Sequence, residues 1–182
     1  VVMPDGAAAA VVDAVYIPEK GVRAVEKSIQ RMIVRALRRA VQELDFVAYE
    51  DPIPTTDVEG LVDLCRALDV PIHIGEFIFS IYDYAEYIRR GALDVVRLIV
   101  DNIGGITGGM KVAHTAECFG LECAPHNWGE VFDHAVHFHL ELAMPNNVWF
   151  EMTVPQGTGD RPYMKDKFRV NQDGYVDAPT KP

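Results

Sequence analysis

The sequence predicts an α/β fold in which short apolar strands alternate with helices and form a parallel sheet. Apolar strands recur at a fixed period, helical patterns lie between them, and an ionisable residue closes each strand. The closing residues, which stand 25 or 26 positions apart, are Glu50, Glu76, Asp101, His126 and Glu151. About 25 residues accommodate one strand, one helix and two short loops. Repeated units of this kind build a parallel sheet that helices cover.

The strands are rich in β-branched and aromatic residues, as half-buried or buried strands are. They are expected at Phe46–Tyr49, Ile72–Gly75, Val95–Val100, Leu121–Ala124 and Val148–Phe150. Val95–Val100 is fully apolar apart from Arg97. Carboxyl ends of parallel strands meet at one edge of a sheet, where α/β proteins bind their ligands. Alternatively, the period reflects only the size of the unit, and the closing residues are ordinary loop residues.

Apolar periodicity and capping residues predict the helices between the strands. They are expected at Arg23–Leu44, from an N-cap at Asp57 to Leu68, at Ile81–Arg90 after Ser80, at Met110–Phe119 and at Val131–Ala143. The glycine-rich run Gly104–Gly109 lacks the spacing of a phosphate-binding loop and is expected to form a tight turn. Residues 1–22 show no clear element. We therefore expect one domain over residues 1–154, weakly assigned over 1–45, and an irregular tail over 155–182.

Composition and charge narrow the class of protein. The chain has 182 residues, enough for one domain with a real core, and its net charge of −10 argues against a nucleic-acid partner. The sequence has no basic run for a membrane surface, no stretch long enough to span one, and no basic leader before its apolar start. The three cysteines form no CxxC pair, which favours free thiols in a reducing cytoplasm.

Glu50 and Glu76 are the strongest metal-binding candidates, because two carboxylates at adjacent strand ends form a site for a hard divalent cation. Mg²⁺ is the expected ion, since it takes a few carboxylates and keeps waters that a substrate can displace. Asp51 is a weaker candidate, because neighbouring side chains of an extended backbone point in opposite directions. The alternative is that both glutamates are helix-capping or loop carboxylates.

His126 is the best candidate for a general base, because its ordinary pKa lies close to physiological pH and it closes a strand. Asp101 is the expected partner, since a carboxylate bonded to an imidazole fixes its tautomer and raises its basicity. Asn102 offers a neutral alternative. The histidines of the following helix, His134, His137 and His139, do not share one helical face, which argues against a zinc site.

Six ordered motifs resemble one family: YEDP, IGEF, VDNIGGITGGMKVAH, APHNWG, FEMTVP and RVNQDGYVDAPTKP. Together, over residues 44–182, they resemble the carboxyl-terminal barrel half of the enolase superfamily, and specifically its mandelate racemase subgroup. The resemblance implies that the sheet is the second half of a (β/α)8 TIM-type barrel, about five βα units, and that the tail returns to a capping domain. It also implies a cytoplasmic enzyme, and we expect a homo-oligomer.

The resemblance also implies chemistry for particular residues. Glu50 matches the second Mg²⁺ ligand and Glu76 the third, His126 matches the base, and Glu151 matches an acidic residue that binds or protonates the substrate carboxylate. The implied reaction removes a proton α to a carboxylate while Mg²⁺ stabilises the enediolate. Most of the subgroup dehydrate acid sugars to 2-keto-3-deoxy acids, whereas others racemise or epimerise 2-hydroxy acids.

The sequence departs from the family pattern at three places. Ile99 stands where the family has the aspartate that partners its histidine, and Asp101 lies two residues further along the same strand face. Ala24 itself, near which the first metal ligand is expected, is not a carboxylate. The family's lysine motif and capping domain are not recognisable. A non-catalytic, incomplete barrel fragment is therefore a further alternative.

Overall fold

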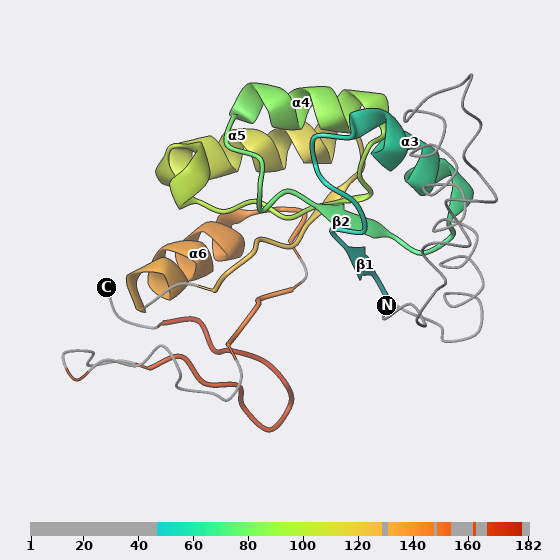
Figure 1. Ribbon diagram of the computed structural model, residues 1–182. Coiled ribbons are helices and arrows are strands. Elements are labelled where there is room, and N and C mark those ends of the chain that lie inside the picture. The colour runs from blue at the N-terminus through green and yellow to red at the C-terminus, as the bar shows by residue number, and fades with distance from the viewer. Residues whose placement is uncertain (1–46, 129–130, 148, 154–161, 163–166, 180–182) are drawn as a thin grey trace, which may run out of the picture.

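The computed structural model describes residues 47–128, 131–147, 149–153, 162 and 167–179 (Figure 1). Predictions for residues 1–46 lie outside this part of the chain. They include the helix Arg23–Leu44, the start of the first strand at Phe46 and the first metal ligand expected near Ala24.

Four short strands form one parallel sheet in sequence order. They are β1 (Tyr49–Glu50), β2 (Ile72–Ile74), β3 (Val95–Val96) and β4 (Glu122–Cys123). The parallel order predicted from the period is confirmed for these four strands. A parallel bridge from Cys123 to Asn147 continues the series, but Trp149 and Phe150 are not in a strand. Val148 lies outside the described residues.

Backbone pairing continues past the assigned strand ends and thereby positions the residues that follow them. The Asp51 amide donates to the His73 carbonyl at 3.1 Å, and the Arg97 amide donates to the Ile74 carbonyl at 2.9 Å. Beside β3, the His126 amide donates to the Leu98 carbonyl at 2.9 Å. The backbone of the predicted site is therefore held by the sheet rather than by free loops.

The helices between the strands are α3 (Val58–Ala67), α4 (Ile81–Arg90), α5 (Gly105–Cys118) and α6 (Val131–Ala143). The Asp57 side chain accepts from the Gly60 amide at 3.0 Å, and Ser80 accepts from the Tyr82 amide at 3.2 Å. Gly91 ends α4 in the left-handed region at φ 65°, where glycine has no Cβ penalty. The predicted caps and the helices that begin after Asp57 and Ser80 are confirmed, as is the helix that begins at Val131.

The glycine-rich run is the clearest error of the prediction. Gly104 and Gly105, at φ 86° and 77°, turn the chain after the 3-10 helix η2 (Asp101–Ile103), and α5 begins at Gly105. A Cβ on Gly108 would lie 1.8 Å from the Ile103 carbonyl oxygen, and one on Gly109 would lie 2.6 Å from Leu140 Cδ2. These two glycines therefore allow close packing of a helix rather than a tight turn.

The core lies between the sheet and the helices, and α4 packs beside α5 (Figure 1). Its fully buried large side chains include those of Leu61, Ile72, Ile74, Tyr84, Leu98 and Leu140. The Tyr84 hydroxyl donates to the Gly75 carbonyl at 2.6 Å. This bond ties α4 to the backbone directly before Glu76 and so fixes the end of β2.

The described part of the tail has a short hairpin. Val170 pairs with Val176 in an antiparallel bridge, and Gly174 turns the chain at φ 86°. The Phe168 ring lies 5.1 Å from the Phe138 ring, which packs the tail against α6. Within the described residues, no helix combines the length and apolar character needed to cross a membrane.

Candidate active site

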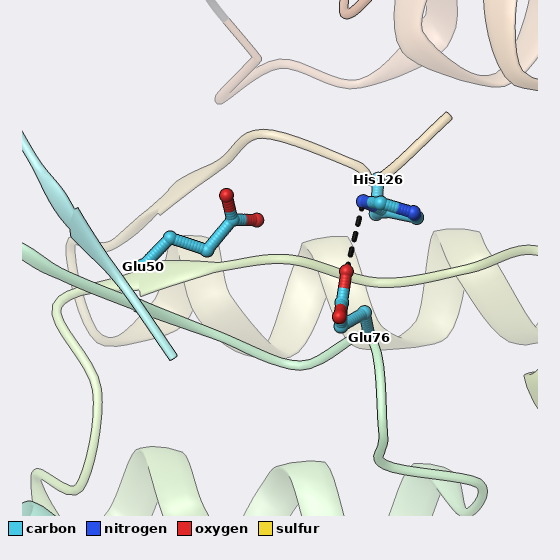
Figure 2. Close-up of side chains that lie close together, drawn as sticks. All are labelled: Glu50, Glu76 and His126. Atoms are coloured by element: carbon cyan, nitrogen blue, oxygen red, sulfur yellow. Dashed lines mark ion pairs between the residues drawn. The ribbon is translucent and has the colours of Figure 1, made fainter. Parts of the chain in front are cut away.

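Three of the predicted site residues converge at the carboxyl edge of the sheet (Figure 2). Glu50 ends β1, Glu76 follows β2 and His126 follows β4. One ligand atom from each residue lies within 4.8 Å of the corresponding atoms of the other two. Within the described residues, these three side chains form a group that could hold a metal ion. The expectation that these three strand ends meet is therefore confirmed.

His126 presents one ring nitrogen to this group. Its Nδ1 lies 2.9 Å from Glu76 Oε2 and 3.5 Å from Glu151 Oε2. In Figure 2 the second ring nitrogen, Nε2, points away from Glu50 and Glu76. Because only about 20% of the side chain is exposed, the ring is held in place yet still reachable. This leaves Nε2 as the atom of His126 that a substrate could approach.

Arg97, which lies directly after β3, is the residue that the sequence reasoning did not place in the site. Its Nε lies 2.6 Å from Glu50 Oε1, and its Nη2 lies 2.8 Å from Glu151 Oε2 and 3.1 Å from His126 Nδ1. Its Nη1 donates to the Ala124 carbonyl at 3.0 Å. Arg97 is only 8% exposed. A single charged residue in an otherwise apolar strand was the signal, since a buried charge must be paired.

Glu151 reaches the site from beyond the fifth predicted strand. Its Oε2 accepts from Arg97 and also from the backbone amide of Asn127 at 2.9 Å. The buried Asn127 side chain donates to the Glu151 carbonyl at 3.2 Å. The segment that carries Glu151 is therefore bound to the loop after β4 by both side chains, although no strand is formed there.

Asp101 does not reach His126, so the predicted Asp101–His126 pair is wrong. The chain leaves the strand geometry after Leu98, and Asp101 begins the 3-10 helix η2 as an exposed residue. Its pKa is raised by partial burial and by the nearby carboxylate of Asp133. Asn102 turns toward the site instead, and its side chain donates to the Glu76 carbonyl at 3.2 Å.

Asp51 lies closer to Glu50 and Glu76 than expected for a side chain that points to the opposite face of an extended strand. It has a left-handed backbone, at φ 41°, and non-glycine residues in that region cluster at functional sites. Burial, followed by the charges of Glu76 and Glu50, raises the pKa of Asp51 to about 6. Its Oδ1 is buried without a hydrogen-bond partner among the described residues.

The arrangement fits Mg²⁺. Hard oxygen donors are the ligands that this ion prefers, and Glu50 and Glu76 supply them from adjacent strand ends. Glu50 is 46% exposed, so its carboxylate faces the opening even though one oxygen contacts Arg97. Glu76 is already turned toward the same space by its contact with His126. Both carboxylates therefore lie close enough to serve one cation.

A parallel α/β sheet with acidic and imidazole groups at its carboxyl ends is the architecture of barrel enzymes whose active sites lie at that face. The chain belongs to the enolase C-terminal domain-like family, whose model matches residues 23–182. The resemblance and the fold class predicted from the sequence are confirmed: this is the carboxyl-terminal part of a TIM-type barrel.

Individual relatives support the same assignment. The chain is 33% identical over 113 residues to L-talarate/galactarate dehydratase of Salmonella typhimurium, covering 62% of this chain and 27% of that protein. It is 32% identical over 136 residues to D-gluconate dehydratase of Thermoproteus tenax, covering 73% of this chain and again 27% of the relative. A mandelate racemase/muconate lactonizing enzyme from Jannaschia sp. CCS1 superposes with a TM-score of 0.71 at 27% identity, over 82% of this chain and 38% of that structure.

Proposed function

We propose that this chain contributes the proton-transfer and metal-binding side of an Mg²⁺-dependent site that dehydrates an acid sugar to a 2-keto-3-deoxy acid. The observation that carries the proposal is the convergence of Glu50, Glu76 and His126 within 4.8 Å. The names of two relatives, L-talarate/galactarate dehydratase and D-gluconate dehydratase, supply the substrate class. The chain spans 27% of the length of both, so the activity of the whole protein is part of the proposal.

Each residue of the site has a distinct part in this reaction. Glu50 and Glu76 would hold the cation, and bound Mg²⁺ would supply Lewis-acid stabilisation of charge that develops at the substrate carboxylate. His126 takes the proton from the α carbon at Nε2, the ring nitrogen that points away from the glutamates. Glu151 lies beside the ring at 3.5 Å and orients it or the substrate carboxylate.

The atoms of the reaction balance without an oxidant or reductant. The α C–H bond breaks, its proton passes to His126, and its electron pair expels the hydroxyl of the next carbon as water after a proton joins it. The resulting enol then gains a proton at that next carbon as it tautomerises to the 2-keto acid.

Product analysis in D₂O tests this proposal. The protein is incubated with Mg²⁺ and a panel of aldonic and aldaric acids, and products are followed by 2-keto-acid detection and mass spectrometry. We expect a 2-keto-3-deoxy acid that carries solvent deuterium at carbon 3. Substrate deuterated at the α carbon without loss of water would instead identify a racemase or epimerase. No reaction and no Mg²⁺ binding by calorimetry would identify a non-catalytic fragment.

The remaining expectations have separate tests. We propose a homo-oligomer in a reducing cytoplasm, which size-exclusion chromatography with light scattering and thiol titration of the purified protein will check. A monomer at micromolar concentration would contradict the first expectation, and blocked cysteines would contradict the second.

A further inference from the structure

The Arg97 side chain makes more polar contacts in the site than the side chain of any predicted site residue. All of these contacts are with other residues of the site. Its guanidinium bonds to Glu50 after β1, to the Ala124 carbonyl after β4 and to Glu151 beyond the fifth predicted strand. It also lies 3.1 Å from His126 Nδ1. The buried guanidinium of Arg97 therefore contacts the side chains of Glu50, His126 and Glu151, which come from three different segments.

These contacts engage most of the N–H groups of Arg97. A guanidinium has five N–H groups in a fixed planar fork and no acceptor. The Nε hydrogen goes to Glu50, one Nη1 hydrogen goes to Ala124 and one Nη2 hydrogen goes to Glu151, while Nη2 also lies 3.1 Å from His126 Nδ1. Because the residue is 8% exposed, water and substrate reach little of it. Arg97 is therefore not a substrate-binding group.

The charges around Arg97 explain why its geometry matters. Glu50 and Glu151 are both within 2.8 Å of its nitrogens, so one cation lies between two carboxylates. Removing one partner of a buried pair leaves an uncompensated charge, which is strongly unfavourable. Without the guanidinium, the two carboxylates would turn away from each other and toward water. The Nδ1 edge of His126 would lose one of its neighbours at the same time.

We propose that Arg97 is the positioning residue of this site, while Glu76 is the carboxylate that faces His126 Nδ1 in place of the one expected at position 99 or 101. Arg97 holds Glu50 and Glu151 in fixed positions beside His126, whose Nδ1–H then faces Glu76 and whose Nε2 stays unprotonated and directed to the substrate. The inference deepens the proposed function and rests on it for the catalytic part. Its geometric part concerns only how these side chains are held.

A lysine cannot replace Arg97 in this role. Its single ammonium nitrogen keeps the charge but cannot reach acceptors on opposite sides of a planar fork. Arg97→Lys therefore separates charge from geometry, while Arg97→Met removes the charge at similar volume. Arg90 provides a matched control, because it also pairs with two glutamates, Glu59 and Glu86, but on the outer helices α3 and α4.

The experiment measures three quantities on Arg97→Lys, Arg97→Met and Arg90→Met. They are the nitrogen-15 chemical shifts of the His126 ring, assigned by comparison with His126→Asn, the melting temperature, and kcat and KM for the acid sugar found in the D₂O experiment. We expect both Arg97 variants to move the His126 signals. We expect Arg97→Lys to melt close to the unchanged protein but to lower kcat about 10-fold or more, with KM within about threefold.

The outcomes separate this inference from the proposed function. If no acid sugar reacts, the proposed function fails, while the His126 signals still decide whether Arg97 holds the ring. Signals in Arg97→Lys that match those of Arg90→Met would overturn the inference even in an active enzyme. A fall in melting temperature with kcat, KM and His126 signals unchanged would likewise overturn it, because that pattern shows a role in stability alone.

Discussion

The strand-end cluster and the buried pair on α6 both place a histidine beside a glutamate, yet their surroundings differ. His126 lies 2.9 Å from Glu76 at the edge of the sheet, with Arg97 beside it. His137 lies 3.9 Å from Glu141, and only 2% of its side chain is exposed. Neither His137 Nδ1 nor Glu141 Oε1 has a hydrogen-bond partner among the described residues. The first cluster is electrostatically paired, and the second is mainly desolvated.

The pKa values follow this difference. Burial lowers the pKa of His137 to about 4 and raises the pKa of Glu141 to about 8, so both groups are uncharged near pH 7. At the strand ends, Arg97 instead pairs with Glu50 at 2.6 Å and with Glu151 at 2.8 Å. Strongly shifted pKa values often mark active sites. In this chain the shifted pKa values of His137 and Glu141 instead reflect desolvation. The metal-binding candidates Glu50 and Glu76 are identified by the distances between their ligand atoms.

The largest expected effect is at Glu76. Glu76→Gln removes one of two anionic ligands, so Mg²⁺ binding measured by calorimetry should fall below detection, and Mg²⁺-dependent turnover should disappear with it. Glu86→Gln, on the exposed surface of α4, is the control and should bind Mg²⁺ as the unchanged protein does. Equal Mg²⁺ affinity in the two variants would show that the strand-end cluster is no more a metal site than the pair on α6.

The next largest effect is at His126. His126→Asn should lower kcat about 10²–10⁴-fold, the usual scale for loss of a general base, while Mg²⁺ affinity stays within a few-fold because the two glutamates remain. His114→Asn, an exposed histidine on α5, is the matched control. Full activity in His126→Asn, measured with the same substrate, would defeat the mechanism.

Much of the fold was predictable, because local patterns determine it. The period placed the strands, and Asp57, Ser80 and Gly91 marked the helix boundaries by their local hydrogen bonds and backbone angles. Gly108 and Gly109 misled the prediction, because a glycine needed for close approach to Ile103 and Leu140 is written the same way as one needed for a turn. Only tertiary contacts distinguish the two uses.

The site was predictable to the extent that strand ends converge. Glu50, Glu76 and His126 meet because they lie at the carboxyl ends of strands of one parallel sheet. Asp101 was assigned by extending strand geometry two residues too far, into a segment that becomes a 3-10 helix. Arg97 was visible only as an odd residue in an apolar strand, since its partners lie 27 to 54 residues away in sequence.

A moderate effect is expected from Glu141 in the pH dependence of stability. Its folded pKa of about 8 lies above the ordinary 4.5, so the folded state retains a proton that the unfolded state has lost. Stability from this group is present below about pH 4.5 and is lost as the pH rises through about 8. His137 titrates with the opposite sign below about pH 6.5, so the window above that value isolates Glu141.

Denaturant unfolding at several pH values measures this effect. Between pH 6.5 and 8 we expect the unchanged protein to lose about 2 kcal/mol more than Glu141→Gln, which stays neutral and can still bond to Asn147. Glu117→Gln, exposed on α5, controls for the change in net charge and should keep the slope. Parallel curves for the unchanged protein and Glu141→Gln would show that the buried carboxyl is charged and paired, like those at the strand ends.

The smallest effect is expected at Asp101. This prediction tests whether Asp101 lies outside the strand-end cluster, as its contacts indicate. If Asp101 oriented His126, Asp101→Asn would cost nearly as much activity as His126→Asn, and the double variant little more, because residues that act as a unit are not additive. The structure instead places Asp101 beside Asp133 at an exposed position. Asp101→Asn should therefore leave kcat and the His126 ring signals unchanged and alter the free energy of unfolding by less than about 0.5 kcal/mol, with any change toward greater stability because two like charges are relieved. Asp133→Asn should relieve the same repulsion, so the double variant should gain no more than either single variant. A large loss of kcat in Asp101→Asn with normal Mg²⁺ binding would return the partner role to Asp101 and contradict the contacts of His126 with Glu76 and Arg97.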